Sequence, residues 1–225
     1  MITIYDVKVE QFLKEQLHAQ FSSFNFIAEE SDNRDVIFGD SIIIDPIDGT
    51  TNFVNGVPHT CISVGIYREQ KPYIGVVYNP ILNEMFYAQV GEGDYLNRQK
   101  IVVSKDLDLS QSLIATGFPV ACVSEPEVLN NVMDNVKTLA SQCQGIRRFG
   151  AAALDLAYVS KGMFAGFYEM NLNPWDVSAG IILVQEAGGK VTNIDGGEFD
   201  FFTDRYVVAS NGLIHDELLR NIESV

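Results

Sequence analysis

The stretch at residues 41–53, with the sequence SIIIDPIDGTTNF, constrains the fold more than any other part of the chain. Three consecutive β-branched isoleucines are typical of a strand that is buried on both faces. Pro46 cannot donate to a sheet ladder, so we expect the strand to end there, with Asp45 at its carboxyl end. The Asp-Gly dipeptide at 48–49 is typical of a turn, and the Thr-Thr-Asn sequence after it contains residue types that open helices. The stretch therefore predicts a strand, an acidic turn and a helix start, at the sheet edge where open α/β folds place ligand crevices.

Two carboxylates, Asp45 and Asp48, thus stand beside free backbone N–H groups. Carboxylates and backbone carbonyls form a hard-oxygen site suited to Mg²⁺, which tends to keep substrate phosphate oxygens among its ligands. The amino end of a helix also favours a phosphate, and the Thr50 hydroxyl stands close enough to orient a water. The alternative is an ordinary surface turn with two aspartates, because turns are rich in Asp and Gly.

The acidity of the chain bears on this choice. The net charge is −15, which argues against a nucleic-acid surface because such a surface needs a basic footprint. Between positions 29 and 48 the only base is Arg34, and the acids are Glu29, Glu30, Asp32, Asp35, Asp40, Asp45 and Asp48. Such a cluster would repel a phosphate ester unless bound cations neutralised it. A solvated acidic face is the other explanation.

Composition and the chain start indicate a globular, cytoplasmic protein without a membrane span. Hydrophobic residues make up 47% and charged residues 20% of the 225 residues, as in a protein with a packed core. No run approaches the roughly 18 apolar residues that span a bilayer, and no secretory signal is visible at the start. Three scattered histidines make a zinc centre unexpected. The cysteines are odd in number and lack C-x-x-C spacing, which suits reduced thiols: Cys61, Cys122 and Cys143.

The order of the predicted strands and helices indicates one unit over 1–225 with two subdomains, roughly 1–108 and 109–225. The first holds an amphipathic helix at Asp6–Leu17 and an antiparallel sheet with consecutive hairpins. Its expected strands, besides the one ending at Pro46, are Phe24–Ala28, Cys61–Tyr67, Tyr73–Tyr78 and Glu84–Val90. The second alternates strands and helices. Its expected strands are Ser112–Thr116, Phe164–Tyr168, Val191–Asn193 and Tyr206–Ala209, and its helices are Glu125–Ala140, Ala151–Lys161, Val177–Ala187 and Leu213–Ile222.

Two further acids stand at the ends of predicted elements in the second half. Glu169 follows a strand, and Asp176 precedes the helix Val177–Ala187. As a helix N-cap, Asp176 would accept N–H bonds and need no further role. The small residues at 178–180 (Ser-Ala-Gly) support the alternative, because they let this helix approach other backbone closely and Asp176 then points into a shared site.

Three motifs occur in order along the chain: AEES at 28–31, DPIDGTTNF at 45–53, and WDVSAG at 175–180 followed by EAGG at 186–189. Supporting matches lie at 3–6, 75–78 and 150–155. Together these motifs resemble the inositol monophosphatase family of Mg²⁺-dependent phosphatases over essentially the whole chain. The resemblance implies a layered α-β-α-β-α sandwich.

The resemblance also implies ligands for two or three Mg²⁺ ions. Glu29, Asp45 and the main-chain carbonyl of Ile47 match the ligands of the first ion. Asp45, Asp48 and Asp176 match those of the second, with Asp45 bridging, and a weaker third ion in the family lies near Glu29.

Further roles are carried over in the same way. Thr50 is similar to the family threonine that positions the attacking water with an acid, here Asp6, and the catalytic set that the resemblance implies is Thr50, Asp6 and Glu29. Backbone N–H groups of Gly49 and Thr50 would contact the phosphate. The implied substrate-contacting residues are Asp48, Gly49, Thr50, Gly150, Ala151, Ala152, Glu169 and Asp176.

The activity implied is direct hydrolysis of a small polyol phosphate, above all inositol monophosphate, by metal-activated water and without a covalent enzyme intermediate. Three sister activities stay open, on fructose 1,6-bisphosphate, a 3′-phosphonucleotide or histidinol phosphate. Beside the inositol phosphatase and these sister phosphatases, a third kind of hypothesis is a non-enzymatic role as a metal-stabilised partner of another macromolecule. An inactive relative would be expected to lose a ligand carboxylate, and none of the four is missing.

The resemblance further implies inhibition by Li⁺ and a homodimer. Family members usually carry a helix and a lysine-bearing loop before the segment that matches Thr3 to Asp6, and the sequence given starts at that segment. Two explanations fit this start: the protein is a naturally short member of the family, or it is longer and has further residues before this segment.

Overall fold

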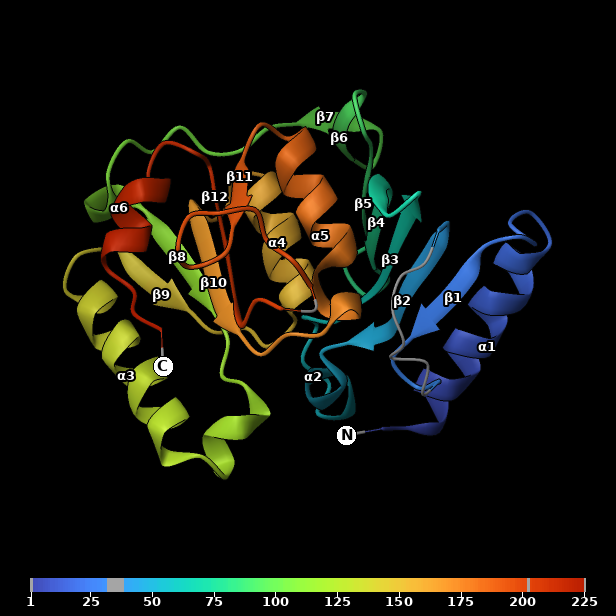
Figure 1. Cartoon of the computed structure of the whole chain (residues 1–225), viewed down its shortest axis with the longest axis horizontal. Helices are drawn as coiled ribbons and strands as arrows, with labels where there is room; N and C mark the ends of the chain where they lie inside the picture. The colour runs from blue at the N-terminus through green and yellow to red at the C-terminus, as the bar shows by residue number, and fades with distance from the viewer. Residues whose placement is uncertain (1, 32–38, 202, 225) are drawn as a thin grey trace.

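The computed structural model describes residues 2–31, 39–201 and 203–224, so most of the polar loop at 32–40 lies outside the described residues. Within the described part of the chain, helices and two sheets form five layers (Figure 1). The order is helix α1, a seven-stranded sheet, helices α4 and α5, a five-stranded sheet, and an outer layer of α3 and α6. The predicted α-β-α-β-α sandwich is confirmed. None of the helices described has the length and apolar character that crossing a membrane requires.

The seven-stranded sheet follows chain order, and β3, β4 and β5 pair as the predicted consecutive hairpins. Its strands are β1 (Asn25–Ala28), β2 (Ser41–Asp48), β3 (Cys61–Arg68), β4 (Lys71–Asn79), β5 (Glu84–Gln89), β6 (Gly93–Leu96) and β7 (Gln99–Ile101). β1 and β2 are parallel, and every other neighbouring pair is antiparallel. Strand β2 is buried on both faces, as predicted: Ile42 and Ile44 pack in the cluster on the α1 side, and Ile43 in the central core.

The predicted end of β2 at Pro46 is wrong. The strand continues to Asp48, and its register with β3 shifts between Asp45 and Asp48. Pro46 lies inside this irregularity, where the lack of a backbone N–H donor does not interrupt the ladder of hydrogen bonds. Strands accommodate proline at such bulges. The proline therefore marks a bulge and not a strand end.

The second sheet has the order β11-β12-β10-β8-β9, with β10, β8 and β9 parallel among the described strands. Its strands are β8 (Leu113–Thr116), β9 (Gly145–Arg147), β10 (Gly166–Met170), β11 (Lys190–Thr192) and β12 (Tyr206–Ser210). The short strands β6, β7 and β9 were not predicted, because three or four residues with turn residues or charges among them show little apolar periodicity. Flanking helices are α1 (Ile4–His18), α3 (Pro126–Ala140) and α6 (His215–Arg220), with short 3₁₀ turns at Leu109–Gln111 and Val120–Val123.

Helices α4 (Ala152–Ser160) and α5 (Pro174–Glu186) form the middle layer. The small residues of α5 lie against glycines, as their sequence predicts. A Cβ on Gly65 would stand 2.6 Å from the Ser178 hydroxyl oxygen, and one on Gly75 would stand 2.6 Å from the Ala179 carbonyl oxygen. Gly180 in turn lies against Leu156 of α4. This close packing brings the first turn of α5 to the edge of β2 and β3.

We expect the substitution Gly75→Ala to destabilise the protein by about 2–3 kcal/mol, which lowers Tm by roughly 5–10 °C. The added methyl meets a backbone oxygen, which cannot rotate away as a flexible side chain would. Gly197→Ala is the matched control, because its Cβ would stand an ordinary 3.4 Å from the nearest atoms. Thermal unfolding of both variants checks the prediction, and equal Tm values would contradict it.

Candidate metal centre and active site

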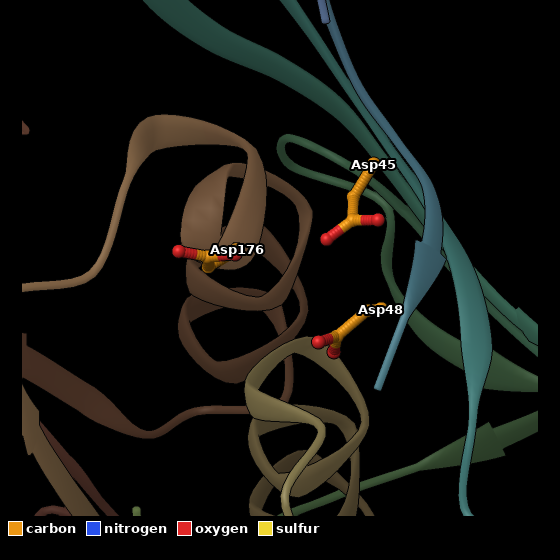
Figure 2. Close-up of side chains that lie close together, drawn as sticks. All are labelled: Asp45, Asp48 and Asp176. Atoms are coloured by element: carbon orange, nitrogen blue, oxygen red, sulfur yellow. The ribbon is translucent and has the colours of Figure 1, made fainter. Parts of the chain in front are cut away.

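Two of the predicted ligands, Asp45 and Asp48, come from β2. Residues three apart on a regular strand point to opposite faces. The register shift between them re-aims the chain, as bulges do, and both carboxylates reach the same side, toward α5 (Figure 2). Asp45 Oδ1 accepts the backbone N–H of Ile47 at 3.0 Å, and Asp48 Oδ2 accepts that of Ala153 at 2.8 Å. The bulge therefore builds the acidic edge that the sequence predicts.

Asp176 joins them from the first turn of α5. One ligand oxygen from each of Asp45, Asp48 and Asp176 can be chosen so that all lie within 4.8 Å of one another (Figure 2). The expectation that Asp176 could be a helix N-cap is wrong, because Asn173 is the N-cap and Asp176 is the third helical residue. Asp176 Oδ2 accepts the Asn173 N–H at 2.6 Å in a capping box. That bond orients the carboxylate at the cluster.

Glu29 lies at the edge of this three-aspartate cluster, directly after β1. Its backbone N–H donates to the Ile44 carbonyl at 3.3 Å. Besides burial, the negative charge of Asp176 raises the pKa of the Glu29 carboxyl group and an interaction with the Asp45 side chain lowers it, so both aspartates lie near Glu29. The four predicted ligand carboxylates are therefore neighbours, although they come from positions up to 147 residues apart (176 − 29).

Burial raises the pKa of each of these carboxyl groups, and the negative charges of the neighbouring carboxylates raise it further. Among the described residues, no ion pair joins any of the four to a Lys, Arg or His. Clustered buried acids without a counter-charge are unfavourable. A divalent cation with oxygen ligands supplies the missing charge. The donor set therefore fits Mg²⁺ or a similar hard cation.

Thr50 and Asp6 also meet, as predicted. Gly49, with φ of 80°, turns the chain out of β2, and the short helix α2 (Thr50–Val54) begins directly after it. The Thr50 Oγ1 atom lies 3.2 Å from Asp6 Oδ1 and 3.0 Å from the carbonyl oxygen of Ile47. Asp6 is fully buried and belongs to α1. The hydroxyl is thus held between a carboxylate and a carbonyl beside the aspartate cluster.

The segment at 150–152 forms a wall next to Gly49. A Cβ on Gly49 would stand 3.1 Å from the Gly150 carbonyl oxygen and from the Ala151 Cβ. The Asn52 side chain links this segment to the loop before β3, because its Nδ2 donates to the carbonyl oxygens of Phe149 at 2.7 Å and His59 at 2.8 Å. Ala151 and Ala152 are both buried, and their methyl side chains carry no polar atom, so any hydrogen bond from this segment to a ligand would have to come from its backbone.

Glu169 lies on the side of the cluster formed by the second sheet. It is the fourth residue of β10, so the prediction that it follows the strand is wrong by a short distance. Its carboxyl group occupies the space that a side chain on Gly117 would need, 2.0 Å from that Cβ position. Burial raises the pKa of Glu169 well above its ordinary value, the charges of Asp176 and other nearby acids add to this, and Arg148 lowers it.

One buried His–Asp pair that lies beside the aspartate cluster was not predicted from the sequence. The His59 ring lies 3.1 Å (Nε2 to Oδ1) from Asp155 and packs on Phe149, with ring centroids 4.7 Å apart. Asp155 belongs to the matched motif at 150–155, but nothing local connects it with a residue 96 positions away. Cys61 was missed in the same way, and its thiol lies 3.7 Å from Asp48 Oδ2.

Comparisons with known proteins agree with this geometry. Residues 1–225 match the model of the inositol monophosphatase family. The chain is 37% identical to the inositol-1-monophosphatase of Caulobacter vibrioides, over 99% of this chain and 87% of that protein. Two solved structures superpose closely. The extragenic suppressor protein suhB from Bartonella henselae has TM-score 0.91 and 37% identity, covering 99% of this chain and 86% of that one. The inositol monophosphatase from Anabaena sp. PCC 7120 has TM-score 0.89 and 39% identity, covering 96% and 84%. The chain therefore belongs to the inositol monophosphatase family, whose members are metal-dependent phosphoric monoester hydrolases.

Proposed function

We propose that this chain is a Mg²⁺-dependent phosphomonoesterase that hydrolyses a small polyol phosphate, with inositol monophosphate as the best substrate. One observation carries the proposal: Asp45, Asp48 and Asp176 converge within 4.8 Å beside a threonine hydroxyl that is bonded to a buried acid. An acidic cluster alone would favour a cation. The adjacent Thr50–Asp6 pair adds a group that can hold a water in line with a phosphorus atom.

We assign the ligands as the resemblance implies. Glu29, Asp45 and the Ile47 carbonyl would hold one ion, and Asp45, Asp48 and Asp176 a second. A third ion near Glu29 stays a prediction. The convergence of Asp45, Asp48 and Asp176 supports the second set of ligands, and the effect of Asp45 and Asp176 on the pKa of Glu29 supports a place for Glu29 beside them. None of the four forms an ion pair with a Lys, Arg or His among the described residues, so the negative charge there favours a cation.

When bound, the divalent ions supply Lewis-acid chemistry, which lowers the pKa of water and neutralises charge on a phosphate. The residues of the chain supply position. Thr50 can accept a hydrogen bond from the attacking water while its own hydroxyl, with the proton kept on oxygen, donates to Asp6 Oδ1 or to the Ile47 carbonyl oxygen, at 3.2 and 3.0 Å. Backbone N–H groups of Gly49 and Thr50 are proposed to hold the phosphate. Positioning of this kind accounts for much of the rate of phosphoryl transfer.

The alcohol portion of the substrate is proposed to lie between the segment at 150–152 and Glu169. Glu169 can accept hydrogen bonds from substrate hydroxyls, which favours a polyol. Besides burial, the negative charges of Asp176 and Asp48 raise the pKa of Glu169, which places these acids near one another and supports one continuous site.

Two relatives keep other functions open. A 28% identical chain is described as an IMPase/NADP phosphatase and was solved with NADP and Ca²⁺. A 36% identical relative from Pasteurella multocida is named Nus factor SuhB. The first favours a phosphonucleotide substrate, but with the phosphate on the ribose 2′-oxygen as in NADP and not on the 3′-oxygen. The second favours a role as a partner of another macromolecule.

Phosphate release from a panel of esters tests these alternatives. We expect the highest kcat/KM for inositol monophosphate, over fructose 1,6-bisphosphate, 3′-phosphonucleotides, NADP and histidinol phosphate. Chelation of Mg²⁺ should abolish release, and Li⁺ should inhibit it. A higher kcat/KM for another ester would reassign the substrate. No release from any ester with saturating Mg²⁺ would contradict the enzymatic proposal and favour the partner role.

A cytoplasmic homodimer completes the proposal. The three cysteines form no disulfide, which is consistent with a reducing compartment. Light scattering coupled to gel filtration measures the oligomeric state directly.

A further inference from the structure

One face of α1 supports two parts of the candidate site. Asp6, Glu10 and Lys14 are four residues apart, so they lie in one row along the helix. Asp6 and Glu10 are the buried residues of this helix. Asp6 contacts Thr50, as described above, and one turn further on Glu10 contacts a different segment.

Glu10 binds the segment Glu29–Ser31 that follows β1. Its Oε2 accepts the backbone N–H of Glu30 at 2.9 Å. Its Oε1 accepts the Ser31 hydroxyl and also the Lys14 ammonium group, the latter at 2.8 Å. Lys14 Nζ lies 2.5 Å from the Ser31 hydroxyl oxygen. Two side chains of α1 therefore clamp a backbone amide and a hydroxyl of the same short segment.

This clamp acts on the residue next to Glu29. The Glu29 N–H is bonded to Ile44 on β2, and the following N–H, that of Glu30, is bonded to Glu10 on α1. The backbone is thus fixed on both sides of the Glu29 side chain. Glu10 is only 4% exposed, and a buried carboxylate needs the charge of Lys14 and these donors to be tolerated.

We propose that Glu10, neutralised by Lys14, is a positioning residue that fixes Glu29 and thereby sets the affinity of the site for a divalent cation. The inference rests on the proposed role of Glu29 as a ligand. It goes beyond that role because Glu10 touches neither cation nor substrate. Residues that orient metal ligands typically contribute about 10–100-fold to metal affinity.

The test is a Mn²⁺ titration of Glu10→Gln by calorimetry, without substrate. Gln loses the charge and one acceptor but keeps the shape, so we expect a dissociation constant about tenfold higher than that of the wild type. The Mg²⁺ concentration for half-maximal phosphate release should rise by a similar factor, while kcat at saturating Mg²⁺ stays within about threefold.

Two further variants sharpen the result. Glu15→Gln is the matched control, because Glu15 is an exposed residue of the same helix and accepts a bond from Gln11. It should leave Mn²⁺ affinity unchanged. Lys14→Met keeps Glu10 but removes its counter-charge, and it should weaken Mn²⁺ binding in the same direction even if Glu10→Gln folds poorly.

An unchanged Mn²⁺ dissociation constant in Glu10→Gln or Lys14→Met would overturn the inference. A variant with a lower Tm and the Mn²⁺ affinity of the wild type is such a result, because it would show a structural role only. The proposed function fails by a different result, namely a wild type that binds Mn²⁺ but releases no phosphate from any ester. In that case the Mn²⁺ titrations of the variants still decide the role of Glu10.

Discussion

Replacing Asp48 by asparagine is expected to abolish turnover while the fold survives. Asp48 contributes one of the three carboxylates that lie within 4.8 Å. Loss of its charge should weaken the second ion and remove several kcal/mol of charge stabilisation, and a loss of about 4 kcal/mol is roughly 10³-fold in kcat/KM. Phosphate release at saturating Mg²⁺ measures the effect.

The fold should survive because asparagine retains the oxygen that accepts the Ala153 N–H, at 2.8 Å in the wild type. It also removes a buried charge, so Tm of the metal-free variant should equal or exceed that of the wild type. Asp134→Asn, on the exposed surface of α3, is the control with the same change in charge. Wild-type activity of Asp48→Asn at saturating Mg²⁺ would refute the assignment.

The metal-free protein is expected to lose stability as pH rises from about 5 to 8. Burial and neighbouring charges raise the pKa values of Asp48 and Asp176 to about 7 in the folded state. A carboxyl group whose folded pKa is raised binds more protons in the native than in the unfolded state, so its contribution is present at low pH and is lost as pH passes the folded pKa. We expect a loss on the order of 3 kcal/mol, or roughly 6–12 °C in Tm.

Divalent cations should reverse this trend, because the ligands bind metal in their deprotonated form. Tm measured across this pH range with chelator and with Mg²⁺ tests both statements. The double variant Asp48→Asn/Asp176→Asn should flatten the curve obtained with chelator. A metal-free Tm that rises from pH 5 to 8 would show that the cluster does not carry the repulsion we assign to it.

Local sequence chemistry predicted the elements that carry strong signals. Three isoleucines specified a strand buried on both faces, and the Asp-Gly dipeptide placed the turn before α2. The small residues at 178–180 predicted the close approach of α5, which the contacts with Gly65 and Gly75 explain. In each case a single local requirement, such as β-branching or lack of side-chain volume, dominates.

Features that depend on distant partners could not be predicted from local chemistry. Pro46 signals the absence of an N–H donor, but whether a strand ends there or bulges depends on its pairing with β3. An aspartate is favourable both at the N-cap and three residues later in the first turn, and here Asn173 takes the N-cap while Asp176 is the third helical residue. The bond from Glu30 to Glu10 spans 20 residues and the His59–Asp155 pair 96. The resemblance brought the four ligand acids together because it carries this long-range information.

The most direct test of the account is an anomalous-scattering crystal structure of the protein with Mn²⁺. We predict a Mn²⁺ ion ligated by the carboxylates of Asp45, Asp48 and Asp176, and a second shared between Asp45 and Glu29. A crystal in which Mn²⁺ binds elsewhere, with these four carboxylates free of metal, would contradict the central claim.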